Sequence, residues 1–405
     1  MKQAKPTVLA INGGSSSIRF ALYAIGDAPQ RRLHGKVERI GLHGTTLTVD
    51  DPSRNQHDSR VIGDFDHHAA ANFLIDWLEQ HIGLMSLAAV GHRIVNGGAD
   101  YNEPQRVTPA LLDALRRISA YAPEHLPSEI AVIELLRERV PSLPQVACFD
   151  TAFHRTLPQV AKRLPIPRRF QAQGVERYGF HGLSYAFLMQ ELVRVAGIEA
   201  AQGRVILAHL GNGASLAAVR GGTSIDTSMG FTPTGGVIMG TRSGDLDPGL
   251  VRYLTHTEAM SAEQFHHMVN HESGLLGVSE TSSDLRDLLA CETDDVRAAE
   301  AVAMFCYQIK KTIGAYAAAL GGLDTLVFAG GIGEHAAVIR ARICEGLKFL
   351  GIEIDATRNA SHAGVISADT GRVTVRVMHT DEEAMIAESV CTVLENAQHQ
   401  DGSGL

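Results

Sequence analysis

The chain has 405 residues, of which 45% are apolar and 20% charged, and its formal net charge is −9. This length exceeds what one ordinary hydrophobic core fills, so we expect two domains with the composition of a soluble enzyme. The acidic balance argues against a broad nucleic-acid interface, which requires a basic face, but it still allows local phosphate binding by backbone N–H groups, Arg and a metal ion.

The sequence has no apolar run near the roughly 18 residues that a membrane span needs, and no apolar signal segment follows the two N-terminal Lys. Its five Cys are widely spaced and form no CxxC pair, which is typical of reduced thiols. We therefore expect a cytoplasmic protein with no membrane partner.

Strand-like and helix-like segments alternate along the chain, which predicts an α/β architecture. The pair Thr108-Pro109 is typical of an N-cap followed by Pro at the first helical position. We expect strands over Thr7–Ile11, Gln145–Phe149, Val205–Ala208, Leu326–Ala329 and Val373–Met378. We expect helices where apolar residues recur at helical spacing from Phe73 to Ile82, after Thr108, over Val296–Leu320 and at the C-terminus.

Two segments of the chain resemble each other. Val8–Tyr23 and Val205–Arg220 each have the pattern of a strand, a turn rich in Gly, Asn and Ser, and a second strand. They are either two ordinary β-hairpins or the mark of a duplicated domain with one phosphate-binding hairpin in each half. The second interpretation places a nucleotide in the cleft between the halves. We expect domains at 1–150 plus 384–405 and at 151–383.

Three Gly-rich turns that follow apolar strands are candidate phosphate or nucleotide sites: Asn12–Ser17, His209–Gly213 and Phe328–Glu334. Gly permits the backbone angles that direct several N–H groups at one anion, and a purine can lie against backbone that has no Cβ. None of the three is a Walker A loop or a G-x-G-x-x-G fingerprint. A purely structural turn remains the alternative for each.

Four charged or titratable residues stand out by their settings. Asp150 ends an apolar strand, where an Asp often faces a ligand, although it can also cap a helix. Arg93 and Arg242 lie beside small residues; a guanidinium binds carboxylate or phosphoryl oxygens in a fork, but an exposed surface Arg is the alternative. His181, like His209, is distinguished among 19 His only by its Gly-rich setting. No zinc-binding pattern occurs.

Together these motifs resemble one family, the acetate kinases with their propionate and butyrate kinase relatives. The matching stretches run in the family's order from residue 8 to residue 387: VLAINGGSSSIRF, GHRIVNGG, CFDTAFHRTLP, RYGFHGLSY, AHLGNGASLAAVRGG, IDTSMGFTPTGGVIMGTRSGDLDPG, FAGGIGEH and HTDEEAMIA. The resemblance implies a duplicated actin-like or hexokinase-like ATPase fold, with two domains around a nucleotide cleft, and a homodimer. It also implies reversible in-line transfer of the γ-phosphoryl group of ATP to acetate, giving acetyl phosphate and ADP.

The resemblance further implies roles for single residues. Arg93 and Arg242 would bind the carboxylate and the phosphoryl group in transit, Asp150 would be the essential acid, and His181 would stabilise the transition state. The metal, Mg²⁺ or alternatively Mn²⁺, would be organised by Asn12 and Glu382, where the adjacent Glu383 is the competing alignment. The acyl group would contact Arg93, Val95, Phe180 and Pro233. ATP would contact Arg19, His209, Leu210, Gly211, Asn212, Gly213, Asp284, Leu285, Arg286, Gly331, Ile332, Gly333, Glu334 and His335.

Four positions depart from the family's pattern. Arg19 stands where Lys is usual, Glu124 and Leu126 where Leu and Asn are usual, and His335 where Asn is usual. Glu124 and Leu126 bear on acyl specificity, and we expect Glu124 to turn away from the substrate and to pair with Arg93 or with the adjacent His. His335 bears on the nucleotide pocket, where we favour capping of the following helix over stacking on the base.

A carboxylic acid is already ionised at pH 7, so it needs no general base, and catalysis depends on positioning and charge compensation. On this argument Asp150 orients a metal, water or Arg. The alternatives are a propionate or butyrate kinase, a sugar kinase or polyphosphatase of the same superfamily, and a non-catalytic nucleotide switch of the actin or chaperone type. The pair Arg93 and Arg242 argues against the last two.

Overall fold

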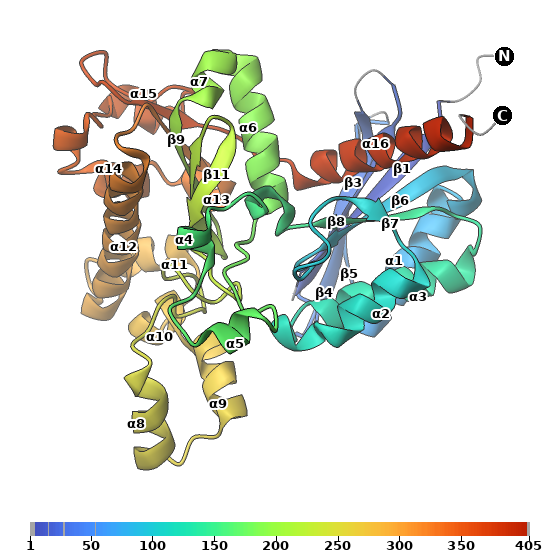
Figure 1. Cartoon of the computed structure of the whole chain (residues 1–405), viewed down its shortest axis with the longest axis horizontal. Coiled ribbons are helices and arrows are strands. Elements are labelled where there is room, and N and C mark those ends of the chain that lie inside the picture. Colours follow the sequence, from blue (N-terminus) through green and yellow to red (C-terminus); the bar gives the residue numbers. More distant parts are fainter. Residues whose placement is uncertain (1–4, 15, 27–28, 53, 403–405) are drawn as a thin grey trace. The chain divides into compact units, whose positions relative to one another are not determined.

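The computed structural model describes residues 5–14, 16–26, 29–52 and 54–402, and the chain divides into two compact units (Figure 1). Unit 1 comprises Met1–Ala152 and Asp381–Leu405, and unit 2 comprises Phe153–Thr380. The sequence prediction put the second boundary after residue 383, whereas the structure assigns Glu382 to unit 1. Ser15, a member of the first Gly-rich turn, lies outside the described residues.

Unit 1 contains an eight-stranded sheet in the order β5-β4-β3-β2-β1-β6-β8-β7. The strands from β5 to β1 are antiparallel neighbours, whereas β1, β6 and β8 run parallel. The strands are β1 (Thr7–Gly13), β2 (Ser17–Ala24), β3 (Gln30–Glu38), β4 (Thr45–Asp51), β5 (Gln56–Gly63), β6 (Leu87–Ile94), β7 (Gln105–Arg106) and β8 (Gln145–Phe149), and the helices are α1 (His67–His81), α2 (Pro109–Arg117), α3 (Leu126–Arg139) and α16 (Glu382–Gly402).

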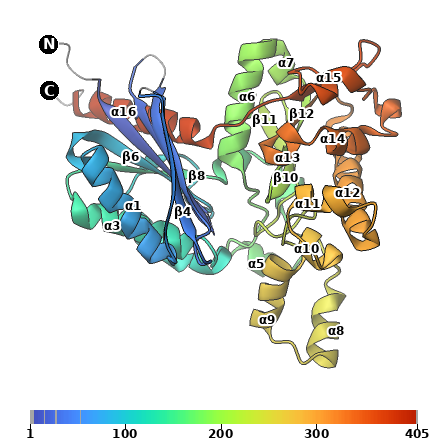
Figure 2. The ribbon, with the colours of Figure 1, turned by 180° about the vertical axis from the view of Figure 1, so that it is seen from behind.

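Helices cover both faces of this sheet. In Figures 1 and 2, α16 crosses one face, and α1, α2 and α3 lie on the other. Gly91 in β6 allows α16 to lie against the sheet, because a Cβ at that position would be 2.4 Å from Cγ2 of Ile386. The predicted N-cap is confirmed, since the Thr108 side chain accepts a hydrogen bond from the Leu111 backbone N–H at the start of α2.

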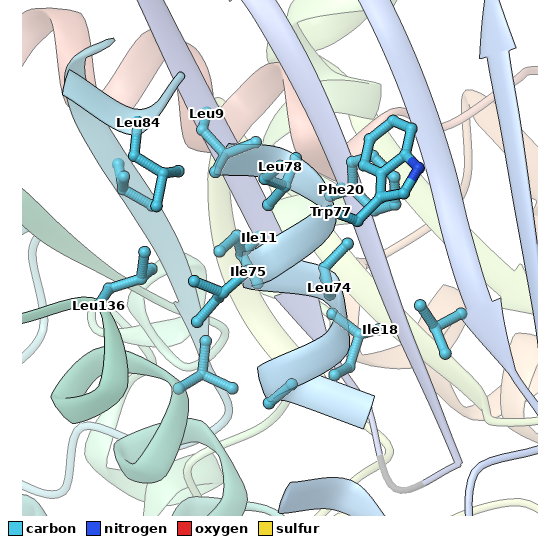
Figure 3. Packing of buried hydrophobic residues seen from close by; sticks show 14 of the residues in the cluster. Leu9, Ile11, Ile18, Phe20, Leu74, Ile75, Trp77, Leu78, Leu84 and Leu136 are labelled. Carbon is cyan, nitrogen blue, oxygen red and sulfur yellow. The ribbon is translucent and has the colours of Figure 1, made fainter. Parts of the chain in front are cut away.

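The main core of unit 1 lies between the sheet and α1 (Figure 3). Side chains two residues apart on a strand point to one face, and residues at helical spacing form one stripe, so the two apolar patterns meet. The labelled members of this core are Leu9, Ile11, Ile18, Phe20, Leu74, Ile75, Trp77, Leu78, Leu84 and Leu136.

Unit 2 contains a five-stranded sheet in the order β11-β10-β9-β12-β13. Its strands are β9 (Arg204–Leu210), β10 (Ala214–Arg220), β11 (Thr223–Thr227), β12 (Thr325–Ala329) and β13 (Thr374–Val377). Its helices are α4 (Gln159–Lys162), α5 (Arg168–Gln171), α6 (Gly182–Ala196), α7 (Ile198–Gln202), α8 (Gly249–Thr257), α9 (Ala262–His267), α10 (Gly274–Ser279), α11 (Leu285–Cys291), α12 (Val296–Leu320), α13 (Gly330–His335), α14 (Ala337–Cys344) and α15 (Ala356–Ala360).

The two sheets share one topology. In unit 1 the strands β3-β2-β1-β6-β8, and in unit 2 the strands β11-β10-β9-β12-β13, form three antiparallel neighbours followed by two strands parallel to the central one. The similar segments of the sequence are the equivalent hairpins β1–β2 and β9–β10. The predicted duplicated α/β fold is therefore confirmed.

Helices α8 and α9 project from the rest of unit 2 (Figure 2). Helix α8 exposes apolar side chains, with Val251 at 45% and Tyr253 at 60% exposure. Within the described part of the chain, no helix combines the length and the apolarity that a membrane crossing requires.

Candidate active site

Arg93, near the end of β6, is held by groups at the ends of the two neighbouring strands β1 and β8. The parallel strands β6 and β8 end side by side, which brings Asp150 next to Arg93. Nε and Nη2 of Arg93 donate to Oδ2 of Asp150 at 3.0 and 2.6 Å, and Nη1 donates to the Gly13 carbonyl at 2.8 Å. Burial acts to lower the pKa of Arg93, but Asp150 and Glu129 outweigh it and raise this pKa. Arg93 is therefore a fixed, permanent cation.

A second carboxylate beside Arg93 comes from Glu129, which the sequence analysis missed. Glu129 is 5% exposed, and its Oε1 lies 3.6 Å from Nη1 of Arg93. The sequence pattern could have indicated a buried role for Glu129, because this residue interrupts an apolar stripe of α3. The stripe is formed by Leu126, Ile130, Ile133 and Leu136. A charged residue in such a stripe is buried only with a partner.

Glu124, the position expected to bear on acyl specificity, is exposed. The carboxylate that reaches Arg93 is that of Glu129, five residues further on. The groups found around the Arg93 guanidinium are Asp150, Glu129 and the Gly13 carbonyl, whereas pairing of Glu124 with the adjacent His125 stays a prediction.

Asn12, at the end of β1, links both candidate metal-binding carboxylates. Its Nδ2 donates to Oε2 of Glu382 at 2.8 Å and to Oε1 of Glu383 at 2.9 Å. Burial and the neighbouring Glu382 raise the pKa of Glu383, while Asn12 and Arg19 act in the opposite direction. Arg19 lies opposite Asn12 in the β1–β2 pairing and is exposed.

These residues fit Mg²⁺ in one respect. Two carboxylates crowded around one amide form an oxygen-rich, negatively charged group that a hard cation would stabilise. No group of three or more His, Cys, Asp or Glu side chains able to hold a metal occurs among the described residues. The two carboxylates of Glu382 and Glu383 are compatible with Mg²⁺, which usually takes one or two protein carboxylates and completes its shell with water and substrate phosphate.

In unit 2, His181 directly precedes helix α6 and has a left-handed backbone conformation, with φ of 60°. Such a backbone is uncommon for a residue other than Gly and often marks a functional position. Its Nδ1 lies 2.8 Å from Oγ of Ser215, and its ring stacks on that of His209 with centroids 4.3 Å apart. The His209 Nδ1 in turn lies 2.8 Å from Oγ of Ser184. Hydroxyl groups thus orient both rings.

Arg242 and His181 meet at the turn between β9 and β10. A Cβ built on Gly213 would lie 3.4 Å from Nε2 of His181 and 3.6 Å from Nη1 of Arg242. Arg242 Nη1 also donates to the Pro233 carbonyl at 3.2 Å. The structure therefore brings together three of the predicted residues, a guanidinium, an imidazole and a Gly-rich backbone, as phosphoryl binding would require.

The Gly-rich turns of unit 2 lie against each other through glycine. A Cβ at Gly240 would lie 2.1 Å from Oδ1 of Asn212, and one at Gly330 would lie 2.7 Å from the Leu210 carbonyl oxygen. Gly330 also has φ of 75°, which other residues rarely adopt. By contrast, a Cβ at Gly331 would meet no atom within 4 Å. Open space therefore lies beside this backbone.

The remaining predicted nucleotide contacts are placed as follows. Asp284 caps helix α11 by accepting from the Arg286 backbone N–H, and its carboxylate also binds the exposed Arg286 side chain. Glu334 accepts from the Gly330 backbone N–H at 3.1 Å.

The prediction that His335 caps the following helix is wrong, because α14 begins after Ala336 and has no side-chain cap. A cap must directly precede the first helical residue, and His335 instead ends α13.

The three apolar residues among the predicted acyl contacts fall in different units. Val95 is buried and follows β6 in unit 1, and its backbone N–H donates to Oε2 of Glu129 at 3.0 Å. Phe180 and Pro233 belong to unit 2, where Phe180 is buried beside His181.

The site residues of each unit form one group. The unit 1 cluster comprises Asn12, Arg93, Glu129, Asp150 and Glu382. The unit 2 cluster comprises His181, His209, Gly213, Ser215 and Arg242.

The repeated sheet and its two Gly-rich hairpins define the class of fold: the duplicated fold of actin-like ATPases. The model of the acetokinase family matches residues 7–388. The chain belongs to this family, and it is an ATP-dependent carboxylate kinase, a phosphotransferase.

Individual relatives support this assignment. The chain is 46% identical to an acetate kinase of Rhodopseudomonas palustris over 388 residues, covering 95% of this chain and 97% of that protein. It is 42% identical to a propionate kinase of Citrobacter rodentium, covering 95% and 96%. The crystal structure of Porphyromonas gingivalis acetate kinase is similar with a TM-score of 0.85 and 37% identity, covering 96% of this chain and 100% of that one.

Proposed function

We propose that the protein transfers the γ-phosphoryl group of ATP to acetate, reversibly, giving acetyl phosphate and ADP. The observation that carries this proposal is the Arg93 guanidinium, 11% exposed and fixed by Asp150 and by the Gly13 carbonyl of the first Gly-rich hairpin, in a chain of the acetokinase family. A fixed guanidinium suits a small anionic acceptor. A non-catalytic nucleotide switch is not favoured by this family membership.

The chemistry needs charge compensation and no base. The substrate carboxylate is already ionised at neutral pH, so Arg93 would bind it, while Arg242 and His181 would stabilise the charge of the phosphoryl group in transit. Oδ2 of Asp150 already accepts two hydrogen bonds from Arg93, which supports an orienting role for this carboxylate. A sugar kinase would instead require a carboxylate available to deprotonate a neutral hydroxyl.

We propose Asn12 and Glu382 as the residues that hold Mg²⁺, with Glu383 as a supporting carboxylate. When bound, the ion supplies neutralisation of phosphate charge. For the nucleotide, the proposed contacts are Arg19, the β9–β10 turn from His209 to Gly213, Asp284–Arg286 and Gly331–His335. The open space beside Gly331 supports a flat base there, and this favours ATP over pyrophosphate as the donor.

The choice of acid rests on three apolar side chains. We propose that Val95, Phe180 and Pro233 contact the acyl group, so that acetate and propionate are used well and butyrate poorly. Discrimination between acetate and propionate should be modest, because one methylene in an apolar pocket is worth about 1–3 kcal/mol. A propionate kinase is the alternative, supported by the 42% identical relative from Citrobacter rodentium.

One assay tests both the proposed carboxylate kinase activity and the proposed preference for acetate. ATP consumption is measured with Mg²⁺ and each C1–C4 acid, and hydroxylamine traps the acyl phosphate. We expect the highest kcat/KM with acetate and ATP formation from acetyl phosphate and ADP. A higher kcat/KM with propionate would reassign the substrate, and ATP loss indifferent to every acid would refute a carboxylate kinase.

We also propose a homodimer located in the cytoplasm. Exposed Leu250 and Tyr253, three residues apart on α8 and therefore neighbours on its surface, support self-association, since adjoining exposed apolar groups mark interaction surfaces.

A further inference from the structure

The unit 1 cluster contains a buried carboxylate, Glu129, that the proposed chemistry does not use. It lies in the first turn of α3, and its Oε2 accepts from the Val95 backbone N–H at 3.0 Å. Its Oε1 lies 3.6 Å from Nη1 of Arg93 and has no hydrogen-bond partner among the described residues. Glu129 also lines a small pocket of unit 1 together with Gly13, Gly14 and Arg93.

The charges next to Arg93 conflict with binding of an anion. The Arg93 guanidinium lies between two buried carboxylates, those of Asp150 and Glu129, and Glu382 adds a further negative charge that acts on it. When both are ionised the three groups carry a net charge of −1, and a substrate carboxylate would be repelled in surroundings that screen charge poorly. A proton on Glu129 makes the three groups neutral and supplies an O–H donor.

We propose that Glu129 positions Arg93 for the substrate and that the carboxylate substrate binds to the form of the enzyme in which Glu129 is protonated. The proton comes from solvent, and the acid enters as its anion. This inference rests on the proposed function, because it takes Arg93 as the group that receives the substrate carboxylate.

The surroundings of Glu129 support a proton there at physiological pH. Burial raises the pKa of Glu129 to about 7, with Arg93 and the Val95 N–H opposing the shift and Asp150 adding to it. The other titratable groups at this pocket are His67 of α1 and His92 of β6. Burial lowers the pKa of His92 to about 4, so His92 is neutral at physiological pH.

A purely structural role makes a different prediction. If Glu129 only anchored the Val95 backbone, its replacement would alter stability without changing how acetate affinity depends on pH. The proposal instead requires KM for acetate to follow the protonated fraction of Glu129, while kcat is nearly unchanged. Because the apparent affinity scales with the competent fraction, KM should rise about tenfold from pH 6 to pH 8.

The kinetic test compares wild type, Glu129→Gln and the control Glu138→Gln at saturating ATP between pH 6 and pH 9. Glu138 is an exposed residue of the same helix. We expect KM for acetate to rise in wild type and in the control, and to stay low and flat in Glu129→Gln. The substrate carboxylate is ionised throughout this range, so its own titration cannot produce the rise.

A binding measurement makes the test independent of turnover. Calorimetric titration of wild type with acetate at pH 7, in buffers of different ionisation enthalpy, should show uptake of about half a proton, because Glu129 is then half protonated. Glu129→Gln should show none. Proton-neutral binding to wild type, or a KM that rises equally in Glu129→Gln, would overturn the inference. Proton-linked binding without turnover would support it and refute the proposed function alone.

Discussion

Arg242 is the side chain on which the proposed transfer depends most. It lies next to Gly213 and His181 in the unit 2 cluster, where a preorganised donor would act on charge that develops in the transition state. Loss of one such donor costs about 2.7–4 kcal/mol, or roughly 10²–10³ in rate. We therefore expect Arg242→Ala to lower kcat by this factor and to change KM much less.

The matched comparison uses Arg242→Lys and Arg220→Ala. Lys keeps the charge without the fork geometry and should restore activity only in part. Arg220 is exposed at the far end of β10, so its replacement should leave kcat unchanged. A wild-type kcat in folded Arg242→Ala would remove this residue from the mechanism.

His92 should make the stability of the protein depend on pH. Burial lowers its pKa to about 4, although the hydrogen bond to Gln145 opposes this shift. The unfolded chain, with an ordinary pKa near 6.5, therefore binds a proton that the folded state excludes. The stability that His92 contributes is present above pH 6.5 and is lost as the pH falls toward 4, which amounts to about 2 kcal/mol by pH 5.

Urea unfolding of wild type and His92→Gln checks this expectation. Because Gln cannot take up the proton, the stability advantage of wild type over the variant should shrink by about 2 kcal/mol from pH 7 to pH 5. The exposed His68→Gln serves as the control and should keep the wild-type pH dependence. An advantage that is constant with pH would contradict the role given to His92.

At the scale of elements, two glycines with opposite surroundings give opposite predictions. Gly240→Ala should displace the Asn212 side chain in the β9–β10 turn, since its Cβ would lie 2.1 Å from Asn212 Oδ1, and should raise KM for ATP. Gly314 lies inside α12 with no atom within 4 Å of an added Cβ. Gly314→Ala should therefore stabilise the protein by about 0.5–1 kcal/mol. Urea unfolding and ATP kinetics of both variants measure these effects. A wild-type KM for ATP in Gly240→Ala together with a loss of stability in Gly314→Ala would contradict these two predictions.

The elements themselves were predictable where pattern and burial agree. The strand Gln145–Phe149 has the bounds predicted from the sequence, because every one of its residues is buried. The helix Val296–Leu320 also has the predicted bounds, because it has an apolar stripe and Asp295 caps its N-terminus. Strand β5 gave no signal, since most of its side chains are exposed. Glu129 was missed because its importance depends on Arg93, which is distant in sequence.

At the scale of the whole molecule, the proposed dimer depends on the projecting helix α8. Its exposed Val251 and Tyr253 leave apolar surface that a second copy can bury. We expect wild type to sediment as a dimer and Val251→Asp combined with Tyr253→Asp to sediment as a monomer. The exposed Val160, on α4, provides the control substitution Val160→Asp, which should remain dimeric. A dimer that survives the double change would place the interface elsewhere.

Helix α16 joins unit 1 although it follows the whole of unit 2 in the chain. During translation, β1 and β6 therefore emerge long before the helix that covers one face of them, and Asn12 emerges long before Glu382 and Glu383. A ribosome-bound chain that already holds all of unit 2 still lacks the carboxylates around Asn12. With the proposed metal site, synthesis order delays kinase competence until residues 381–402 have been made, and it leaves an apolar sheet face for chaperones to shield in the meantime.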